Sequence, residues 1–382
     1  MSFQLSSEQE AIRDVVREFG ENEIRPVARE HDESREYPHD LVEEAAQYDL
    51  VAPTISEEYG GAGMDLLTSA VVTEELWRAD PGIGSAIGSR GFGTTMIQEF
   101  GDEWMKAEWL PKVAAGDAAT CSCISEPAHG SDVAGIETRA ELDEEAGEWV
   151  LNGDKMWITN GTIADVAVVM AKTSPGERHR GITAFLVEAD REGFEPTKID
   201  NKLGIRASDL AEIRLNDVRV PEDNVIGAVD QGFYQLMAFF AGGRTSVAAQ
   251  AVGAAQGALD AAIEYAEERE QGGQRIKEYQ AISHKVAEMA TNVEAARSLT
   301  YRAASVVDEG NDDQLAAKFA SMAKLFASER AVEVADEGIQ VHGGAGFVTD
   351  HPAERFYRDA RITKIYEGTS EIQKNIISDQ VL

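Results

Sequence analysis

The stretch Trp149-Val150-Leu151-Asn152-Gly153-Asp154-Lys155-Met156-Trp157-Ile158-Thr159, near the middle of the chain, decides the fold class. The residues on either side of Asn-Gly have the character of short strands, and Asn-Gly itself favours a two-residue hairpin turn. We therefore predict strands at 149–151 and 155–159, joined by a turn at Asn152-Gly153. Further strands of the same β-domain, which we place at residues 118–225, are predicted at 138–142, 164–172, 182–187 and 211–220.

Helical periodicity surrounds this β segment on both sides. Before it, Ser6 and Gln9 have capping-box spacing and apolar residues follow at helical intervals, which predicts a helical domain over residues 1–117. After Gly232 the chain is rich in alanine, and residues 226–382 are predicted to form a four-helix bundle. The fold class is therefore α+β and multidomain, with a central β-barrel or sheet. The longest helices are expected at 244–270, 279–308 and 313–338.

The charge of the chain is extreme, with 69 acidic residues against 35 basic ones and a net charge of −34. This balance excludes a nucleic-acid-binding protein, which needs a basic surface. Acidic residues spread along the chain repel one another unless salt screens them, so we expect a halophilic protein from a salt-accumulating cytoplasm. The N-terminus shows no basic region followed by an apolar segment, and the apolar run Val166 to Ala171 is too short to span a membrane.

The chain has two cysteines, Cys121 and Cys123, separated by one residue. In a strand their side chains lie on the same face, at a spacing poorly suited to a disulfide. A Cys-x-Cys pair near His129 resembles half of a metal site, but the sequence has no second ligand pair at zinc-like spacing. We expect two buried thiols and no metal site.

A second informative stretch, Ile365-Tyr366-Glu367-Gly368-Thr369-Ser370-Glu371-Ile372-Gln373, places a carboxylate just before a final apolar-periodic segment. Gly368 lets another molecule approach the backbone, and Thr369 or Ser370 caps the next helix. A carboxylate held there is suited to be a general base for a carbon acid, because desolvation raises its pKa. The alternative from these residues alone is an ordinary acid at a helix start.

Two motifs of the β-domain suit a flat, partly polar ligand. Ser125-Glu126-Pro127-Ala128-His129-Gly130-Ser131-Asp132 offers small hydroxyls around a glycine, and Trp157-Ile158-Thr159 offers an aromatic surface beside a hydroxyl. Taken singly, each has a simpler explanation, a turn for the first and a core tryptophan for the second.

Taken together and in order, these motifs closely resemble the acyl-CoA dehydrogenase family of flavoenzymes over essentially the whole chain. Leu203 to Asp209 and Gln340 to Phe347 complete the series. The resemblance implies FAD bound between the β-domain and the C-terminal bundle, and a homotetramer built as a dimer of dimers. It assigns cofactor contacts to Ile124, Ser125, Gly130, Ser131, Trp157, Ile158, Thr159, Arg269, Gln280, Gln340, Gly344, Thr369 and Glu371.

The same resemblance implies the reaction. Glu367 would remove the α-proton of an acyl-CoA thioester while a β-hydride passes to flavin, giving a trans-2-enoyl-CoA as in fatty acid β-oxidation, with electrons passing to an electron-transfer flavoprotein. Substrate contacts are assigned to Ser131, Arg244, Tyr366 and Gly368. Some relatives place the base beside the arginine that Arg244 resembles, but the preceding residues here are Ala241, Gly242 and Gly243, and none of them accepts a proton.

The sequence departs from the family pattern in two places. The usual Arg-x-x-Phe-Gly reads Arg269-Glu270-Gln271-Gly272-Gly273, without its aromatic, and His129 stands where many relatives carry a small residue. Two other functions stay open: an acyl-CoA oxidase that passes electrons to oxygen, and a flavin-free binding or scaffold protein on the same fold.

Overall fold

The first helix of the chain begins at the capping residue that the sequence predicts. The computed structural model describes residues 5–174, 176 and 178–382. Ser6 caps the first helix by a capping box, in which its hydroxyl accepts from the Gln9 N–H and its own N–H donates to the Gln9 side chain. The helices of this first part are α1 (Ser7–Phe19), α2 (Ala28–Ser34), α3 (His39–Ala46), α4 (Leu66–Ala79), α5 (Pro81–Gly88), α6 (Thr94–Phe100) and α7 (Glu103–Ala114).

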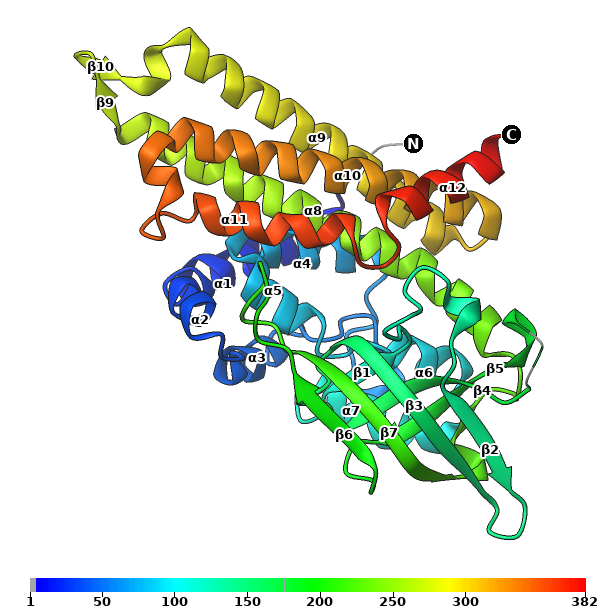
Figure 1. The fold of residues 1–382 in the computed structure, drawn as a ribbon. Coiled ribbons are helices and arrows are strands. Elements are labelled where there is room, and N and C mark those ends of the chain that lie inside the picture. Colours follow the sequence, from blue (N-terminus) through cyan, green and yellow to red (C-terminus); the bar gives the residue numbers. More distant parts are fainter. Residues whose placement is uncertain (1–4, 175, 177) are drawn as a thin grey trace.

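The middle of the chain forms a mixed sheet that lies beside the helical parts (Figure 1). Its hydrogen-bonded order is β6-β7-β3-β2-β4-β5-β8, with β1 paired to β4. The pairs β1–β4 and β2–β4 are parallel and the others antiparallel. The strands are β1 (Thr120–Cys123), β2 (Arg139–Asp143), β3 (Glu148–Thr159), β4 (Val166–Lys172), β5 (Ile182–Glu188), β6 (Phe194–Lys198), β7 (Leu210–Pro221) and β8 (Val225–Ile226).

The predicted turn at Asn152-Gly153 is wrong, because both residues lie inside the single long strand β3. The register between β3 and β7 shifts between Leu151 and Gly153, which marks a bulge. Asn152 exchanges two hydrogen bonds with Asp217 of β7. A side chain at Gly153 would overlap Thr138, so glycine here serves close packing within the sheet rather than a turn.

Strand β6 was not among the predicted strands. It is short, it contains Pro196, and four of its five residues are exposed. Proline is tolerated at a sheet edge because no ladder hydrogen bond is lost there, and an exposed edge strand carries little apolar alternation. Helix α8 also begins at Gly232, twelve residues before the predicted start at Arg244.

The C-terminal part is a helical bundle whose long members pack through small residues. Its helices are α8 (Gly232–Glu268), α9 (Gln280–Glu309), α10 (Asp313–His342), α11 (Ala353–Ala360) and α12 (Ser370–Val381), and a hairpin of β9 (Glu270–Gln271) and β10 (Gln274–Arg275) joins α8 to α9. An added Cβ at Gly253 would lie 2.7 Å from Trp77 Cβ, so α8 approaches α4 closely. The helix–sheet–helix fold class is confirmed.

Buried ion pairs join the first helical part to the bundle. Glu74 of α4 accepts hydrogen bonds from Arg297 Nε at 2.8 Å and from the Tyr301 hydroxyl at 2.9 Å, both in α9. Arg355 of α11 donates to Asp80 at 2.7 Å. Because each carboxylate is almost fully buried, removal of its partner would leave an uncompensated charge.

Two smaller expectations concern the thiols and the membrane. Cys121 and Cys123 are unpaired and buried in the same core of the sheet, with their sulfur atoms 3.8 Å apart, which confirms buried thiols. Within the described ranges, no helix is both long and apolar enough to cross a membrane.

Candidate active site

Glu367 lies in a short loop between the turn at Arg361–Lys364 and helix α12, and α12, shown in red in Figure 1, packs on α10. Its backbone φ is +51° and that of Gly368 is +90°, so two consecutive residues occupy the left-handed region. Gln373 donates from Nε2 to the carbonyls of Glu367 (3.1 Å) and Gly368 (2.8 Å). Thr369 caps α12 by accepting from the Ile372 N–H, as predicted. The cap and Gln373 together fix the loop.

The Glu367 carboxylate is placed among groups that perturb it. Burial raises the pKa of Glu367 to about 7, although the charges of Arg244 and Lys324 oppose the shift. Among the described residues, its Oε2 atom has no hydrogen-bond partner. An added Cβ at Gly243 of α8 would lie 3.0 Å from that oxygen, so glycine leaves room for it. A carboxylate with a pKa near neutrality and one unengaged oxygen has the properties of a general base.

The neighbours of Glu367 are tied to the surrounding helices. The Tyr366 hydroxyl donates to the Gln250 side chain of α8. Ser370 donates to Glu329 of α10 at 2.9 Å, and Lys364 forms an ion pair with the same carboxylate at 2.6 Å. The predicted substrate contacts Tyr366, Gly368 and Arg244 are therefore gathered around Glu367, and Arg244 is 8% exposed.

The sheet brings the other two motifs together. The Met156 N–H donates to the Ser125 carbonyl at 2.9 Å, which joins the Ser125–Asp132 segment to the end of β3. Trp157 has a φ of +63° at a second register shift of β3, and its side chain is 59% exposed. Ile124 and Ile158 are buried, Ser125 and Thr159 are partly buried, and Gly130 and Ser131 are exposed. The C-terminal end of β3 and the adjoining loop therefore present an aromatic ring and small hydroxyls to the surroundings.

A buried ion pair between Lys155 and Glu126 holds the segment at Ser125–Asp132 against β3. Lys155 Nζ donates to Glu126 Oε1 at 2.9 Å and to the Ile124 carbonyl at 3.3 Å. Glu126 also accepts from the backbone N–H groups of Glu137 and Thr138. The chain therefore fixes the loop before Gly130 without using the hydroxyls of Ser125 and Ser131.

Four other predicted cofactor contacts lie at the other end of the bundle, whereas Thr369 and Glu371 are at the start of α12, close to Glu367. Gln340 and Gly344 flank His342, whose ring stacks on Tyr265 at 4.5 Å, and Arg269 follows four residues after Tyr265. Figure 1 shows the adjoining β9–β10 hairpin far from the sheet. One chain therefore does not bring Arg269, Gln280, Gln340 or Gly344 to Trp157, and their assignment to a neighbouring subunit's cofactor stays a prediction. At the missing aromatic, the Tyr279 hydroxyl lies against Gly272 and donates to the Gln271 carbonyl.

Comparisons with known proteins agree with this architecture. Family models match residues 6–117 (acyl-CoA dehydrogenase, N-terminal domain), 121–218 (middle domain) and 230–382 (C-terminal domain). The short-chain specific acyl-CoA dehydrogenase of Clostridium acetobutylicum is 39% identical over 382 residues, which cover 100% of both chains. The chain belongs to the acyl-CoA dehydrogenase family. It is an oxidoreductase of that family.

Solved structures of this family match over the full chain. Butyryl-CoA dehydrogenase from Megasphaera elsdenii is 36% identical with a TM-score of 0.94, and the match covers 100% of both chains. A chain in the structure of the electron transferring flavoprotein of Acidaminococcus fermentans is 38% identical with a TM-score of 0.95, again over 100% of both. A glutaryl-CoA dehydrogenase from Mycobacterium smegmatis in complex with FADH2 is 32% identical with a TM-score of 0.91, over 99% of this chain and 95% of the other.

Sequence reasoning missed three side chains that surround the base of this acyl-CoA dehydrogenase: Gln250, Lys324 and Gln373. Lys324 is fully buried in α10, and its Nζ donates to the Gly368 carbonyl at 2.6 Å. One signal was available, because Lys324 shares a helix face with Ala320 and Ala327, which are both buried. A lysine on an apolar stripe is rare enough to mark a special position.

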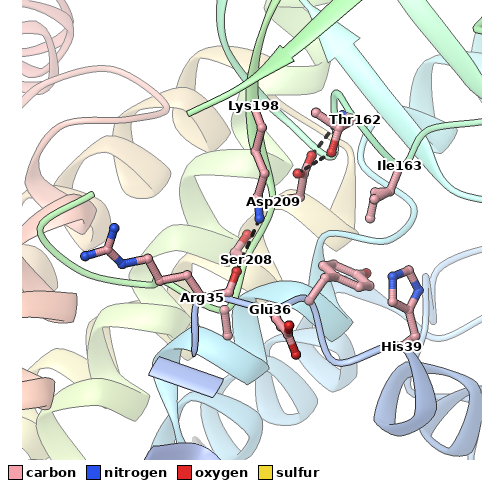
Figure 2. Close-up of a pocket in the computed structure, with 10 residues that line it drawn as sticks. Arg35, Glu36, His39, Thr162, Ile163, Lys198, Ser208 and Asp209 are labelled. Atoms are coloured by element: carbon pink, nitrogen blue, oxygen red, sulfur yellow. Dashed lines mark hydrogen bonds between the residues drawn. The ribbon is translucent and has the colours of Figure 1, made fainter. Parts of the chain in front are cut away.

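A separate cavity of about 340 Å³ lies between the first helical part and the sheet, and contains none of the predicted site residues. Figure 2 shows its polar groups bonded to one another: Asp209 accepts from the Thr162 N–H and hydroxyl, and Lys198 donates to the Arg35 carbonyl. This cavity is a junction between domains. Within the described ranges, no group of three or more His, Cys, Asp or Glu side chains is arranged to hold a metal.

Proposed function

We propose that this chain dehydrogenates the Cα–Cβ bond of an acyl-CoA thioester to a trans-2-enoyl-CoA, with FAD as the acceptor and Glu367 as the α-proton base. The observation that carries the proposal is the environment of Glu367. Its pKa lies near neutrality, its Oε2 atom has no described partner, and Gly243 leaves space beside it.

The residues at the C-terminal end of β3 fit a flavin. Trp157 is 59% exposed and has a left-handed backbone conformation, and both an exposed aromatic residue and backbone strain are typical of ligand sites. Ser131 and Thr159 would supply hydroxyl donors beside that ring, and Gly130 has open space where a Cβ would lie. When bound, FAD supplies a two-electron acceptor for the β-hydride. A flavin-free scaffold would have no use for this exposed ring, or for a buried carboxylate with a raised pKa.

The chain itself would carry out the proton step. Glu367 takes the α-proton on its carboxylate, and burial of the site makes the neutral product acid favourable near pH 7. No described residue accepts a hydrogen bond from the Glu367 N–H, so that donor is available to the thioester carbonyl as negative charge develops on it. Arg244 adds positive charge close to the site, because its charge acts on the Glu367 carboxylate.

The proposal extends to partners and surroundings. An electron-transfer flavoprotein is the proposed acceptor, supported by the likeness to a chain in the Acidaminococcus fermentans structure of that protein. A homotetramer is proposed from the family resemblance, and it is supported by the β9–β10 hairpin directly after Arg269, which lies far from the sheet of its own chain in Figure 1. The proposed compartment is the cytoplasm.

The test is the visible spectrum of the purified protein, followed by anaerobic addition of an acyl-CoA series. We expect a yellow protein that one chain-length class bleaches, and slow recolouring in air. Rapid recolouring by oxygen would instead establish the acyl-CoA oxidase. A colourless protein that takes up no FAD would contradict the flavin assignment and leave the scaffold function.

The net charge of −34 supports a second proposal, that the chain is adapted to a salt-rich cytoplasm. At about 0.1 M ionic strength the screening length is about 10 Å, and at 1 M it is about 3 Å, so salt should weaken the repulsion strongly. We expect the melting temperature to rise on going from dilute buffer to molar potassium chloride. A melting temperature that is independent of salt would refute the adaptation.

A further inference from the structure

Lys324 is a fully buried ammonium with one described hydrogen-bond acceptor, the Gly368 carbonyl at 2.6 Å. Burying an ammonium is unfavourable unless hydrogen bonds and opposite charge compensate it. Burial lowers the pKa of Lys324 to about 8, and the charge of Glu367 is the largest effect that opposes this. The lysine is therefore stabilised by the base segment itself.

The position of its acceptor matters for the backbone. Gly368 O accepts from both Lys324 Nζ and Gln373 Nε2, directly after the residue whose φ is +51°. A left-handed conformation at a non-glycine residue is strained and persists only when its surroundings over-determine it. Two donors on one carbonyl provide that constraint.

The charges around the lysine come from three helices and the loop. Arg244 of α8 faces it with like charge, whereas Glu367, Glu329 of α10 and Glu371 of α12 face it with opposite charge. Glu329 already has an ion pair with Lys364 and a hydrogen bond from Ser370. The cations that act on Glu367 are Arg244 and Lys324.

We propose that Lys324 is a positioning residue for the base: through the Gly368 carbonyl it fixes the backbone that carries Glu367, and its charge favours the ionised carboxylate. The inference rests on the proposed role of Glu367 as the base. Lys324 acts on Glu367 in two separable ways, through its hydrogen bond to the Gly368 carbonyl and through its charge.

The charge is tested by an infrared pH titration of the purified protein without substrate, in which a Glu367→Gln spectrum identifies the Glu367 signal. Loss of a nearby cation raises the pKa of an acid, so Lys324→Met should move the Glu367 midpoint up by about one pH unit. Lys318→Met, in the same helix two turns earlier, should leave the midpoint in place. An unchanged or lowered midpoint in Lys324→Met overturns the proposal.

The hydrogen bond is tested by comparing two uncharged variants. Both variants lose the positive charge, so both should raise the Glu367 midpoint. Only Lys324→Gln keeps a hydrogen-bond donor, so kcat should fall by about tenfold more in Lys324→Met. If Lys324→Met fails to fold, the midpoint of Lys324→Gln decides the role of the charge. Equal kcat in both variants and the wild type overturns the backbone role. A wild type that no acyl-CoA reduces refutes the proposed function, while the titration still reports on Lys324.

Discussion

Trp157 and Glu367 share a backbone conformation that side chains seldom adopt, with φ of +63° and +51°, but the chain surrounds them differently. Glu367 lies inside a frame supplied by the same chain: Gln373 and Lys324 hold the backbone behind it, and Tyr366 is bonded to Gln250. Trp157 stands near the C-terminal end of β3 and is 59% exposed. The base is preorganised within the chain, whereas the aromatic surface is left for another molecule to cover.

This difference teaches which functions are separable. A change at Glu367 should remove chemistry and leave the aromatic surface intact, because no described hydrogen bond joins the two segments. A change at Trp157 should weaken cofactor binding and leave the frame of the base intact. Five experiments follow from this comparison.

The largest expected effect is that of Glu367→Gln. Loss of the base should lower turnover of the preferred acyl-CoA by at least about 10³-fold, at the upper end of what general base catalysis contributes. The flavin absorbance of the purified variant should equal that of the wild type. Asp379→Asn, an exposed acid of α12, is the matched control and should retain full turnover. Substantial dehydrogenation by Glu367→Gln would remove Glu367 from the role.

The second effect compares two tryptophans of one strand. Trp149 is 7% exposed and packs edge-on to Phe185 at 5.4 Å, so Trp149→Ala should cost about 3–5 kcal/mol of unfolding free energy. Trp157→Ala should change that free energy by no more than about 0.5 kcal/mol. Urea unfolding of the FAD-free protein measures both.

The same pair separates stability from cofactor binding. Trp157→Ala should raise the dissociation constant for FAD by about tenfold, as expected for loss of an aromatic stacking contact worth about 1 kcal/mol. Fluorescence titration of the FAD-free protein measures it. A Trp157→Ala variant that unfolds as readily as Trp149→Ala would show that the exposed ring has a structural role.

The third effect concerns pH. Folding raises the pKa of Glu367 from 4.5 to about 7, so between these values the folded protein binds more protons than the unfolded chain. This group therefore lowers stability as pH rises through that window. The stability of Glu367→Gln relative to wild type should be greater at pH 8 than at pH 4, by about 3 kcal/mol. An equal difference at both pH values would contradict the raised pKa.

The smallest effect uses two adjacent glycines of α8. An added Cβ at Gly243 would lie 3.0 Å from Glu367 Oε2, whereas one at Gly242 meets no atom within 4 Å. Both alanine variants gain helix propensity, worth about 1 kcal/mol. Gly243→Ala should nevertheless lower turnover by about tenfold through displacement of the carboxylate, and Gly242→Ala should not. Equal rates in the two variants would show that the carboxylate has room to move.

The sequence predicted the regions whose signal is local. Helix periodicity located α9 and α10 to within a few residues, and Thr369 was one of two candidate caps for α12. The family resemblance assigned Glu367, Arg244 and Tyr366 to one site before the structure was known. The turn at Asn152-Gly153 failed because the preference of that dipeptide was overridden by pairing of β3 with β7, a contact between distant residues.

Lys324 and Gln250 could not be assigned by motif for a related reason. Each acts on the 366–368 loop from a helix far away in sequence, 44 residues from Gly368 for Lys324 and 116 residues from Tyr366 for Gln250. Nothing in the order of residues along α8 or α10 states which loop will pack there. Only the tertiary arrangement makes these side chains neighbours of the base.

The buried pair of Glu74 and Arg297 has a consequence for biosynthesis. The two residues are 223 positions apart, and Arg297 leaves the ribosome long after the first helices have emerged. Until α9 arrives, α4 carries a carboxylate whose final partners, Arg297 and Tyr301, do not yet exist. The nascent N-terminal helices therefore complete their packing only when most of the chain has been made, because α4 needs α9 to pair its buried carboxylate.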